Sequence, residues 1–277
     1  MSLRVLVTND DGVTAPGLAR LAGEAVDRGL DVVVAAPLEE ASGASAAMTA
    51  VEHEGHVVVR EQPLPELPDV PVYGVAGSPG FVVLIAVRGA FGPPPSVLLA
   101  GVNRGANVGR AVLHSGTVGA AFTAAANGCR AMAVSLDVPP SAGAVAGGPA
   151  GNPAMRVRDV GRHWSTAARV ALDLLPRLTG GPVESVLNVN APDLPYERLR
   201  GVRRAALASF GQAQMTVAET GHGYLRTALT APEQVVQPGT DLFWLAEGYA
   251  SATAIRAVTE VSDVDLSGLS GEAWRPT

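Results

Sequence analysis

The sequence predicts an α/β fold in which a Rossmann-like, mostly parallel sheet carries helices on both faces and a β-hairpin arm follows near the C-terminus. Short apolar runs rich in valine alternate with longer stretches of helical spacing through the first half of the chain. This strand–helix–strand order is typical of parallel sheets covered on both faces. Turn residues with weak alternation over residues 202–229 predict the arm.

Turn residues or caps bound each element of the first half. The expected strands cover residues 3–8, 31–36, 70–75, 96–100 and 131–136, with a strand or hairpin arm over 49–60. A first helix is expected to begin with Thr14 as its N-cap and Pro16 at an early helical position, and to end near Gly29. Two more helices are expected over the apolar stretch 80–91 and the alanine-rich stretch 116–128.

The second half has fewer clear signals. A helix is expected over 157–178, a strand over 185–189 and a late strand over 248–255. Residues 139–153 are rich in Pro, Gly, Ala and Ser, which predicts a flexible loop, and this composition fits a lid and a plain linker equally well. We interpret residues 1–277 as one domain, with a core over 1–136 and a flexible loop over 137–155.

Composition excludes several classes of protein. The 277 residues carry 20 basic and 26 acidic side chains, a net charge of −6, which argues against a nucleic acid polymer as the partner. The densest apolar run, residues 81–87, is far shorter than the roughly 20 residues of a membrane helix. Cys129 is the only cysteine and no signal segment precedes the first strand, so a cytoplasmic protein without membrane contact is expected.

The strongest chemical signal is Asn9-Asp10-Asp11-Gly12, directly after the first expected strand. Two adjacent carboxylates repel each other unless a cation or a proton lies between them, and Gly12 permits a tight turn. An acidic turn that caps the next helix would explain the same residues. Ligands of parallel sheets, however, bind at the carboxyl ends of the strands, so the position favours a metal site.

Three further motifs are weak one by one. Ser42-Gly43 comes shortly after the second strand, the stretch GVNRGANVG at 101–109 follows the strand 96–100, and His114-Ser115-Gly116-Thr117 opens the alanine-rich helix. Each has a plain interpretation as a turn, a Gly/Asn loop or an N-cap. A helix N-terminus with free N–H groups is also a site for anions.

Together the four motifs should converge on one edge of the sheet. They offer carboxylate, hydroxyl and amide oxygens and no Cys/His cluster, a donor set that suits Mg²⁺, Mn²⁺ or Ca²⁺ rather than zinc. A hard cation beside a helix N-terminus suits a phosphoryl group. The sequence therefore predicts a divalent-metal-dependent phosphatase that acts on a small-molecule phosphate monoester.

In this order the motifs VTNDDG, Ser-Gly, GVNRGANVG and HSGTVGAA resemble the SurE (stationary-phase survival) family of 5′/3′-nucleotidases. The resemblance is close over residues 3–136 and returns at 187–190 and 247–251. It implies one divalent cation per subunit, Mg²⁺ or Mn²⁺ before Ca²⁺, and hydrolysis of nucleoside 5′(3′)-monophosphates. It implies a homodimer or homotetramer with an exchanged C-terminal arm, which residues 200–230 would supply. The implied metal ligands are Asp10, Asp11, Ser42 and Asn103, of which Asp10 and Asp11 are also catalytic, and the implied phosphate contacts are Asn9, Asn107, Ser115, Gly116 and Thr117.

Some positions depart from the family pattern and leave the substrate open. Gly77-Ser78-Pro79-Gly80-Phe81 stands where the family usually has Gly-Thr-Pro-Ala-Asp, and Thr123 where a glutamate is usual. Glu39 and Glu40 stand where basic or polar residues are common, and two acids at a pocket rim would disfavour polyphosphates. A specialised phosphatase for a non-standard nucleotide, sugar or metabolite phosphate is the alternative, and a non-catalytic phosphate-binding protein a more distant one.

The attacking group and the role of His114 stay open at this level. We expect water as the nucleophile, with Asp10 as a covalent nucleophile in competition. His114 fits a substrate-binding general acid and a loop-orienting residue equally well. A dinucleotide-binding dehydrogenase would need its glycine-rich fingerprint after the first strand, where this chain has two acids. A haloacid-dehalogenase-type phosphatase would need two aspartates separated by one residue.

Overall fold

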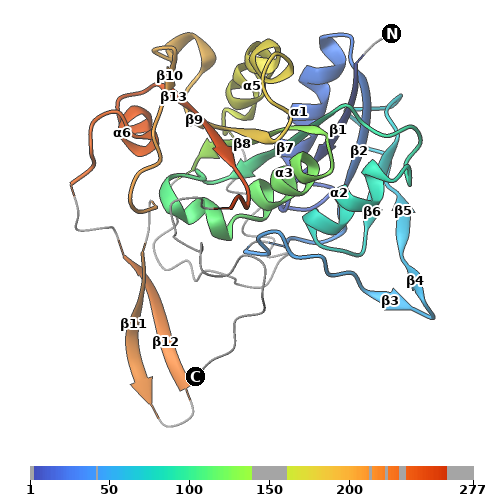
Figure 1. Cartoon of the computed structure of the whole chain (residues 1–277), viewed down its shortest axis with the longest axis horizontal. Helices are drawn as coiled ribbons and strands as arrows, with labels where there is room; N and C mark the ends of the chain where they lie inside the picture. Colours follow the sequence, from blue (N-terminus) through green and yellow to red (C-terminus); the bar gives the residue numbers. More distant parts are fainter. Residues whose placement is uncertain are drawn as a thin grey trace, which may run out of the picture.

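The computed structural model describes residues 3–41, 43–138, 161–211, 214–221, 224–230 and 235–260. Within these residues nine strands form one sheet in the order β10-β13-β9-β8-β7-β1-β2-β6-β5 (Figure 1). The strands are β1 (Arg4–Thr8), β2 (Asp31–Pro37), β5 (Val59–Glu61), β6 (Val72–Val75), β7 (Val97–Arg104), β8 (Arg130–Asp137), β9 (Ser185–Pro192), β10 (Val202–Arg204) and β13 (Ala250–Arg256).

The pairing in this sheet is mostly parallel, as the sequence predicts. From β6 to β9 every neighbouring pair is parallel, and β10 is parallel to β13. Only β5 on β6 and β13 on β9 are antiparallel. The carboxyl ends of β1, β7 and β8 therefore lie side by side along one edge, where we expect a ligand site.

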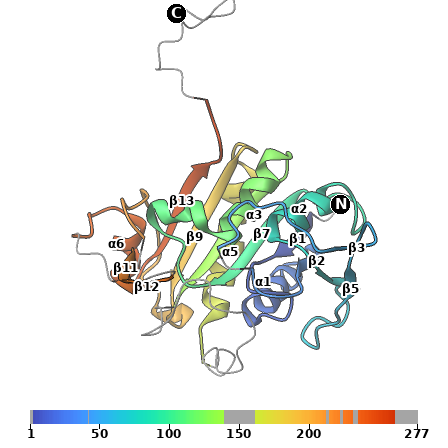
Figure 2. The same ribbon diagram turned by 90° about the horizontal axis from the view of Figure 1, so that it is seen from below.

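Helices cover both faces, which confirms the predicted α/β class. Helices α1 (Pro16–Asp27) and α5 (Trp164–Thr179) pack on one face, while α2 (Pro79–Val87) and α3 (Gly116–Ala126) pack on the other (Figure 2). Successive side chains of β1 alternate between the two: Val5 and Val7 belong to the core under α1 and α5, and Leu6 to the core under α2 and α3. Strands buried on both faces explain the unbroken apolar runs of the sequence.

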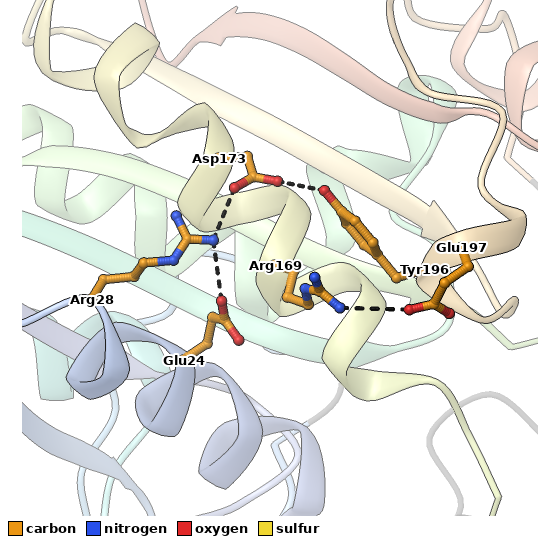
Figure 3. A network of polar contacts seen from close by, with 6 residues as sticks. All are labelled: Glu24, Arg28, Arg169, Asp173, Tyr196 and Glu197. Atoms are coloured by element: carbon orange, nitrogen blue, oxygen red, sulfur yellow. Dashed lines mark hydrogen bonds and ion pairs between the residues drawn. The ribbon is translucent and has the colours of Figure 1, made fainter.

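A polar network joins α1 to α5, the two helices that cover the same face of the sheet (Figure 3). Arg28, just after α1, donates to Glu24 at 3.2 Å and to Asp173 of α5 at 2.9 Å. The hydroxyl of Tyr196, in the short helix η2 (Tyr196–Arg198), donates to Asp173 at 2.7 Å. Arg169 of α5 lies 4.0 Å from the centroid of the Tyr196 ring and 3.8 Å from a carboxylate oxygen of Glu197.

Two predicted helix starts are wrong. The N-cap of α1 is Ala15 rather than Thr14, because Ala15 N bonds to Gly12 O and Pro16 takes the first helical position. Helix α5 begins at Trp164 rather than residue 157, since Asp193 accepts a hydrogen bond from His163 N at 2.9 Å and holds that residue outside the helix. Residues 157–160 and the whole expected loop 139–153 lie outside the described residues.

Two strand predictions also change. Strand β7 continues past Ala100 to Arg104, because pairing with β8 resumes at Asn103 after an irregularity, so Asn103 lies in a strand and not in a loop. The stretch expected as a single arm divides: β10 joins the main sheet, and β11 (Gln214–Gly221) pairs with β12 (Tyr224–Thr230) in a separate hairpin that projects from the body (Figure 1). The expected arm over 49–60 is the small hairpin of β3 (Glu52–His53) and β4 (His56–Val57) followed by β5.

Cys129 lies at the junction of α3 and β8, inside the core under α2 and α3. Its side chain is 3% exposed, and burial raises the pKa of its thiol to about 12. It is a core residue. Among the described residues, no helix combines the length and apolarity needed to cross a membrane.

Candidate active site at the carboxyl edge of the sheet

Asp10 and Asp11 follow β1 at the carboxyl edge of the sheet. Gly12 turns the chain with a φ of +99°, a value that glycine adopts without strain, and Val13 N then bonds to Pro37 O at 2.8 Å. The turn buries Asp10 to 4% exposure on the α2/α3 side of the edge. Two carboxylates are thus fixed side by side at the point where parallel sheets hold ligands.

The side-chain hydroxyl of Thr117 contacts Asp10 and Asn103. This hydroxyl donates to Asp10 Oδ1 and lies 3.2 Å from Asn103 Oδ1. The amide nitrogen of Asn103 donates to Gly105 O at 2.7 Å, which leaves the Asn103 oxygen facing the Thr117 hydroxyl. The structure therefore brings Asn103 of β7 and Thr117 of α3, 14 positions apart in the sequence, together with Asp10, which lies 107 positions before Thr117.

The N-terminus of α3 forms one wall of the site. Ser115 caps the helix, its hydroxyl oxygen accepting from Val118 N at 3.1 Å. A Cβ atom on Gly116 would lie 2.7 Å from Asp10 Oδ2, so only glycine admits the carboxylate at this distance. The first turn of a helix offers free N–H groups and partial positive charge, which favours a bound anion beside Asp10.

The two carboxyl groups are electrostatically strained in the absence of a cation. Burial raises the pKa of Asp10, against the hydrogen bond from Thr117 that lowers it. Burial and the neighbouring Asp10 carboxylate raise the pKa of Asp11 well above its ordinary value, although Arg104 N donates to Asp11 Oδ2 at 3.1 Å. The charge of Glu40 raises the pKa of both groups further. A site of this kind binds positive charge favourably.

Asn107 is held firmly behind the site. Its main-chain N–H donates to Asn190 Oδ1 at 2.8 Å, and its carbonyl accepts from the amides of Asn188 and Asn190 at 2.8 and 3.0 Å. Its side-chain amide donates to Ser135 Oγ at 2.9 Å. Asn188 and Asn190 are two residues apart in β9, so both point to the same face of the sheet as Asn103.

Ser42 lies outside the described residues, but both its flanks reach the site. Ala41 N donates to Asp10 O at 2.7 Å. On the other flank, Ser45 Oγ donates to Leu113 O at 2.7 Å, and a Cβ atom on Gly119 of α3 would lie 2.1 Å from Ser45 O. The chain on either side of Ser42 is therefore packed against Asp10 and against the first turns of α3.

Asn9 and His114, two residues that were expected to bind the substrate, differ in their exposure to solvent. Asn9 is fully buried and its amide nitrogen donates to Gly12 O at 3.0 Å, which stabilises the turn. Its Oδ1 has no hydrogen-bond partner among the described residues. His114, at the end of the short helix η1 (Gly109–His114), has an exposed side chain that forms no hydrogen bond with the described residues.

The residues present fit a divalent cation. Asp10, Asp11 and Asn103 supply hard oxygen donors, and burial raises the pKa of both carboxyl groups, so a nearby cation would stabilise their charged forms. In the described part of the chain, no group of three or more His, Cys, Asp or Glu side chains is placed so that it could hold a metal ion. An oxygen set of two carboxylates completed by an amide suits Mg²⁺ or Mn²⁺.

Comparison with known proteins gives the family. A family model described as "Survival protein SurE" matches residues 5–216. The chain belongs to the SurE family. It is 35% identical over 259 residues to the "5′-nucleotidase SurE" of Coxiella burnetii (strain RSA 331 / Henzerling II), covering 92% of this chain and 89% of that protein. It is also 35% identical over 262 residues to the "5′-nucleotidase SurE" of Actinobacillus pleuropneumoniae serotype 5b (strain L20), covering 92% of this chain and 94% of that protein.

A solved SurE structure agrees with the fold. The crystal structure of the SurE protein from Aquifex aeolicus superposes with a TM-score of 0.69 at 25% identity and covers 96% of both chains. The SurE resemblance that the motifs predicted is therefore confirmed.

Sequence reasoning missed the residues that support the SurE site. Ser135, Asn188 and Asn190 reach Asn107 from β8 and β9, and Asp241 reaches Gly109 from the C-terminal part of the chain. One signal existed: asparagine alternates with apolar residues at 187–190, which places two amides on one face of a buried strand. Asp241 carries no comparable local pattern.

Proposed function

We propose that this chain is a divalent-cation-dependent phosphomonoesterase that hydrolyses nucleoside 5′-monophosphates to nucleoside and phosphate. The observation that carries the proposal is the contact of Thr117, at the N-terminus of α3, with Asp10 and Asn103. This contact places the N-terminus of α3, the proposed phosphate site, next to the oxygen atoms proposed to bind the cation. The family and the names of the two bacterial relatives support the same reaction.

We propose Asp10, Asp11 and Asn103 as the cation ligands, with Ser42 as a fourth, and Mg²⁺ or Mn²⁺ as the ion. When bound, the ion neutralises the charge of the phosphoryl oxygens and polarises the phosphorus centre. The Thr117 hydroxyl holds Asp10 and Asn103 in one orientation, and Gly116 leaves room for the carboxylate. Arg104 N holds Asp11 in the same way.

The N-terminus of α3 binds the phosphate group in this proposal. The N–H groups of Gly116 and Thr117 and the hydroxyl proton of Ser115 are the donors, and the partial charge of the helix end adds to them. Asp10 Oδ1 accepts from Thr117, and the Asp10 carboxylate is a ligand of the cation in this proposal, so we assign the attack on phosphorus to a water molecule. Glu40 adds negative charge near the carboxylates, which favours substrates with a single phosphate.

The deciding experiment is phosphate release from nucleoside 5′- and 3′-monophosphates, a sugar phosphate, p-nitrophenyl phosphate and tripolyphosphate, each with Mg²⁺, Mn²⁺ or EDTA. We expect the highest kcat/KM for nucleoside 5′-monophosphates, no release in EDTA, and a loss on the order of 10²-fold in Asp11→Asn. Asp31→Asn is the matched control, since Asp31 pairs with Arg4 at the opposite edge of the sheet. Equal activity in EDTA and in Mn²⁺, or preference for the sugar phosphate, would contradict the proposal.

The attacking group has its own test. With a substrate whose phosphate is made chiral by oxygen isotopes, direct attack by water should invert the configuration at phosphorus. Net retention, which results from two successive displacements, would replace water by Asp10 as the nucleophile.

We also propose that the β11–β12 hairpin is an oligomerisation arm of a single-domain subunit, forming a homodimer or homotetramer. The hairpin pairs only within itself in the described structure and projects from the body (Figure 1), and an isolated two-stranded hairpin is marginally stable in water. Sedimentation of the full chain beside a variant lacking residues 214–230 tests this: a monomeric full-length chain would refute it.

A further inference from the structure

Asp241 is a buried carboxylate outside the motifs of the site. It opens the short helix α6 (Asp241–Ala246), its exposure is 0%, and burial raises its pKa. Its hydrogen-bond donors in the described structure are all backbone N–H groups. Asp241 Oδ2 accepts from Gly109 N at 2.8 Å, and Oδ1 accepts from Ala208 N at 3.0 Å and from Leu242 N at 2.9 Å.

Gly109 is the first residue of η1, which leads directly to Ser115 at the start of α3. Gly109 has a φ of +59°, and a Cβ atom there would lie 2.0 Å from Phe210 O. Its neighbour Arg110 donates through N to Ala208 O at 3.2 Å. The stretch from Gly109 to Ser115 therefore has no freedom to shift at its first residue without disturbing residues 208–210.

The other end of this connection is the base of the hairpin. Residues 205–211 lead into β11, and residues 235–241 follow β12. The two stretches are joined by Asp241 N to Ala206 O at 2.9 Å, Ala206 N to Gly239 O at 3.1 Å and the Ala208 bond to Asp241. One carboxylate thus binds the two sides of the hairpin base and the first residue of η1.

We propose that Asp241 is a positioning residue for phosphate binding: it fixes η1, and through η1 the N-terminus of α3, against the base of the hairpin. This rests on the proposed function, since it assigns the phosphate group to that helix end. A carboxylate suits the role because it accepts at both oxygens, and such charge-assisted bonds to N–H groups are strong. An asparagine would accept at one oxygen only and turn an NH₂ group toward one set of donors.

The test compares Asp241→Asn with Thr240→Ala as a matched control. Thr240 is the neighbouring buried residue and caps α6 through Phe243 N at 3.4 Å, but its side-chain hydrogen bonds in the described structure are to Gln237 and Phe243 and not to Gly109. In Asp241→Asn we expect KM and the inhibition constant of inorganic phosphate to rise about tenfold together, with kcat nearly unchanged, because the phosphate contacts act in the ground state and the transition state alike. The Mn²⁺ concentration for half-maximal activity should not move. Thr240→Ala should change none of these constants.

Two measurements keep the proposal testable without turnover. Titration calorimetry with inorganic phosphate and Mn²⁺ should show the same tenfold weaker binding in Asp241→Asn. In the unmodified protein, phosphate should slow backbone amide exchange in residues 205–211 and 239–243 as well as in 107–117, because coupling between the two regions is reciprocal. Unchanged phosphate affinity in the variant, or protection confined to 107–117, would overturn it. A wild-type chain that binds phosphate and cleaves no ester would refute the proposed function and leave these two measurements decisive for Asp241.

Discussion

Gly116 is the residue at which the site depends most directly on the absence of a side chain. A Cβ atom there would lie 2.7 Å from Asp10 Oδ2 and 2.9 Å from Asp10 Cβ. The carboxylate oxygen can rotate away, but Asp10 Cβ is fixed by the backbone. The helix end or Asp10 must therefore shift, although alanine is the better helix former by about 1 kcal/mol.

We expect Gly116→Ala to lower kcat/KM on the order of 10²-fold while the free energy of unfolding changes little, because a displacement of about 1 Å is enough for such a loss. Gly23→Ala is the control: Gly23 is also in a helix, and its Cβ atom would meet Leu67 at an ordinary 3.8 Å. Steady-state kinetics and urea unfolding of both variants check this. Full activity in Gly116→Ala would show that Asp10 tolerates a different position.

For single residues of the site, some positions could be predicted from the sequence and some contacts could not. Asp10, Asp11 and Asn103 were predictable, because each follows or ends a strand whose apolar pattern is clear, and carboxyl ends of parallel strands share an edge. Thr117 was expected to contact the phosphate, and no feature of the sequence indicated that its hydroxyl also donates to Asp10. Which of two nearby acceptors a hydroxyl chooses depends on distances that a sequence does not contain.

At the scale of elements, helix interiors were predictable and helix ends were not. The interiors follow apolar spacing, but α5 begins where Asp193, thirty residues later, accepts from His163 N. One strand in the second half of the sheet, β10, was missed for a similar reason. β10 is too short to show a pattern, and it becomes a strand because β13 is beside it. Tertiary contacts of this kind override local propensity.

The network of Figure 3 makes a prediction at this scale, since it joins α1, α5 and η2 on the face away from the site. Partial burial acts to raise the pKa of Asp173, but the hydrogen bonds from Tyr196 and Arg28 outweigh it and hold the pKa below its ordinary value of 3.8. A lowered pKa in the folded state adds stability above pH 3.8 that disappears as the pH falls through the lowered value.

We expect Tyr196→Phe to reduce the free energy of unfolding at pH 7 by less than about 1 kcal/mol, because the network is solvent-screened. The difference from wild type should vanish at pH values below the pKa of Asp173, where the carboxyl group is protonated in both proteins. Urea unfolding at pH 7 and at acid pH measures it. Phosphatase activity should stay at the wild-type level; a loss of activity would mean that the two faces of the sheet are coupled.

For the whole molecule, the raised pKa values of Asp10 and Asp11 link stability to pH and to the cation. Raised values in the folded state mean that the cation-free protein is favoured at acid pH and loses stability as the pH rises through them. In the proposed site a divalent cation would bind the charged carboxylates and offset this loss, with a gain of about 2.7 kcal/mol at a concentration one hundred times its Kd.

We therefore expect the increase in Tm on adding Mn²⁺ to be several degrees at pH 8 and much smaller at pH 5, where protons compete for the same oxygens. Differential scanning fluorimetry at the two pH values, with Asp31→Asn behaving as wild type and Asp11→Asn showing little increase, checks this. An equal increase at both pH values would place the bound cation somewhere other than on these carboxylates.

Cys129 gives this molecule a built-in reporter of its own opening. The thiolate is the form that reacts with alkylating reagents, and a buried group with a pKa of about 12 presents almost none of it. A reagent reaches the sulfur only when the layer of α2 and α3 separates from the sheet. The rate at which Cys129 is alkylated in the unmodified chain therefore reports how often the layer of α2 and α3 separates from the sheet. A ligand that contacts both the end of β1 and α3 should lower this rate.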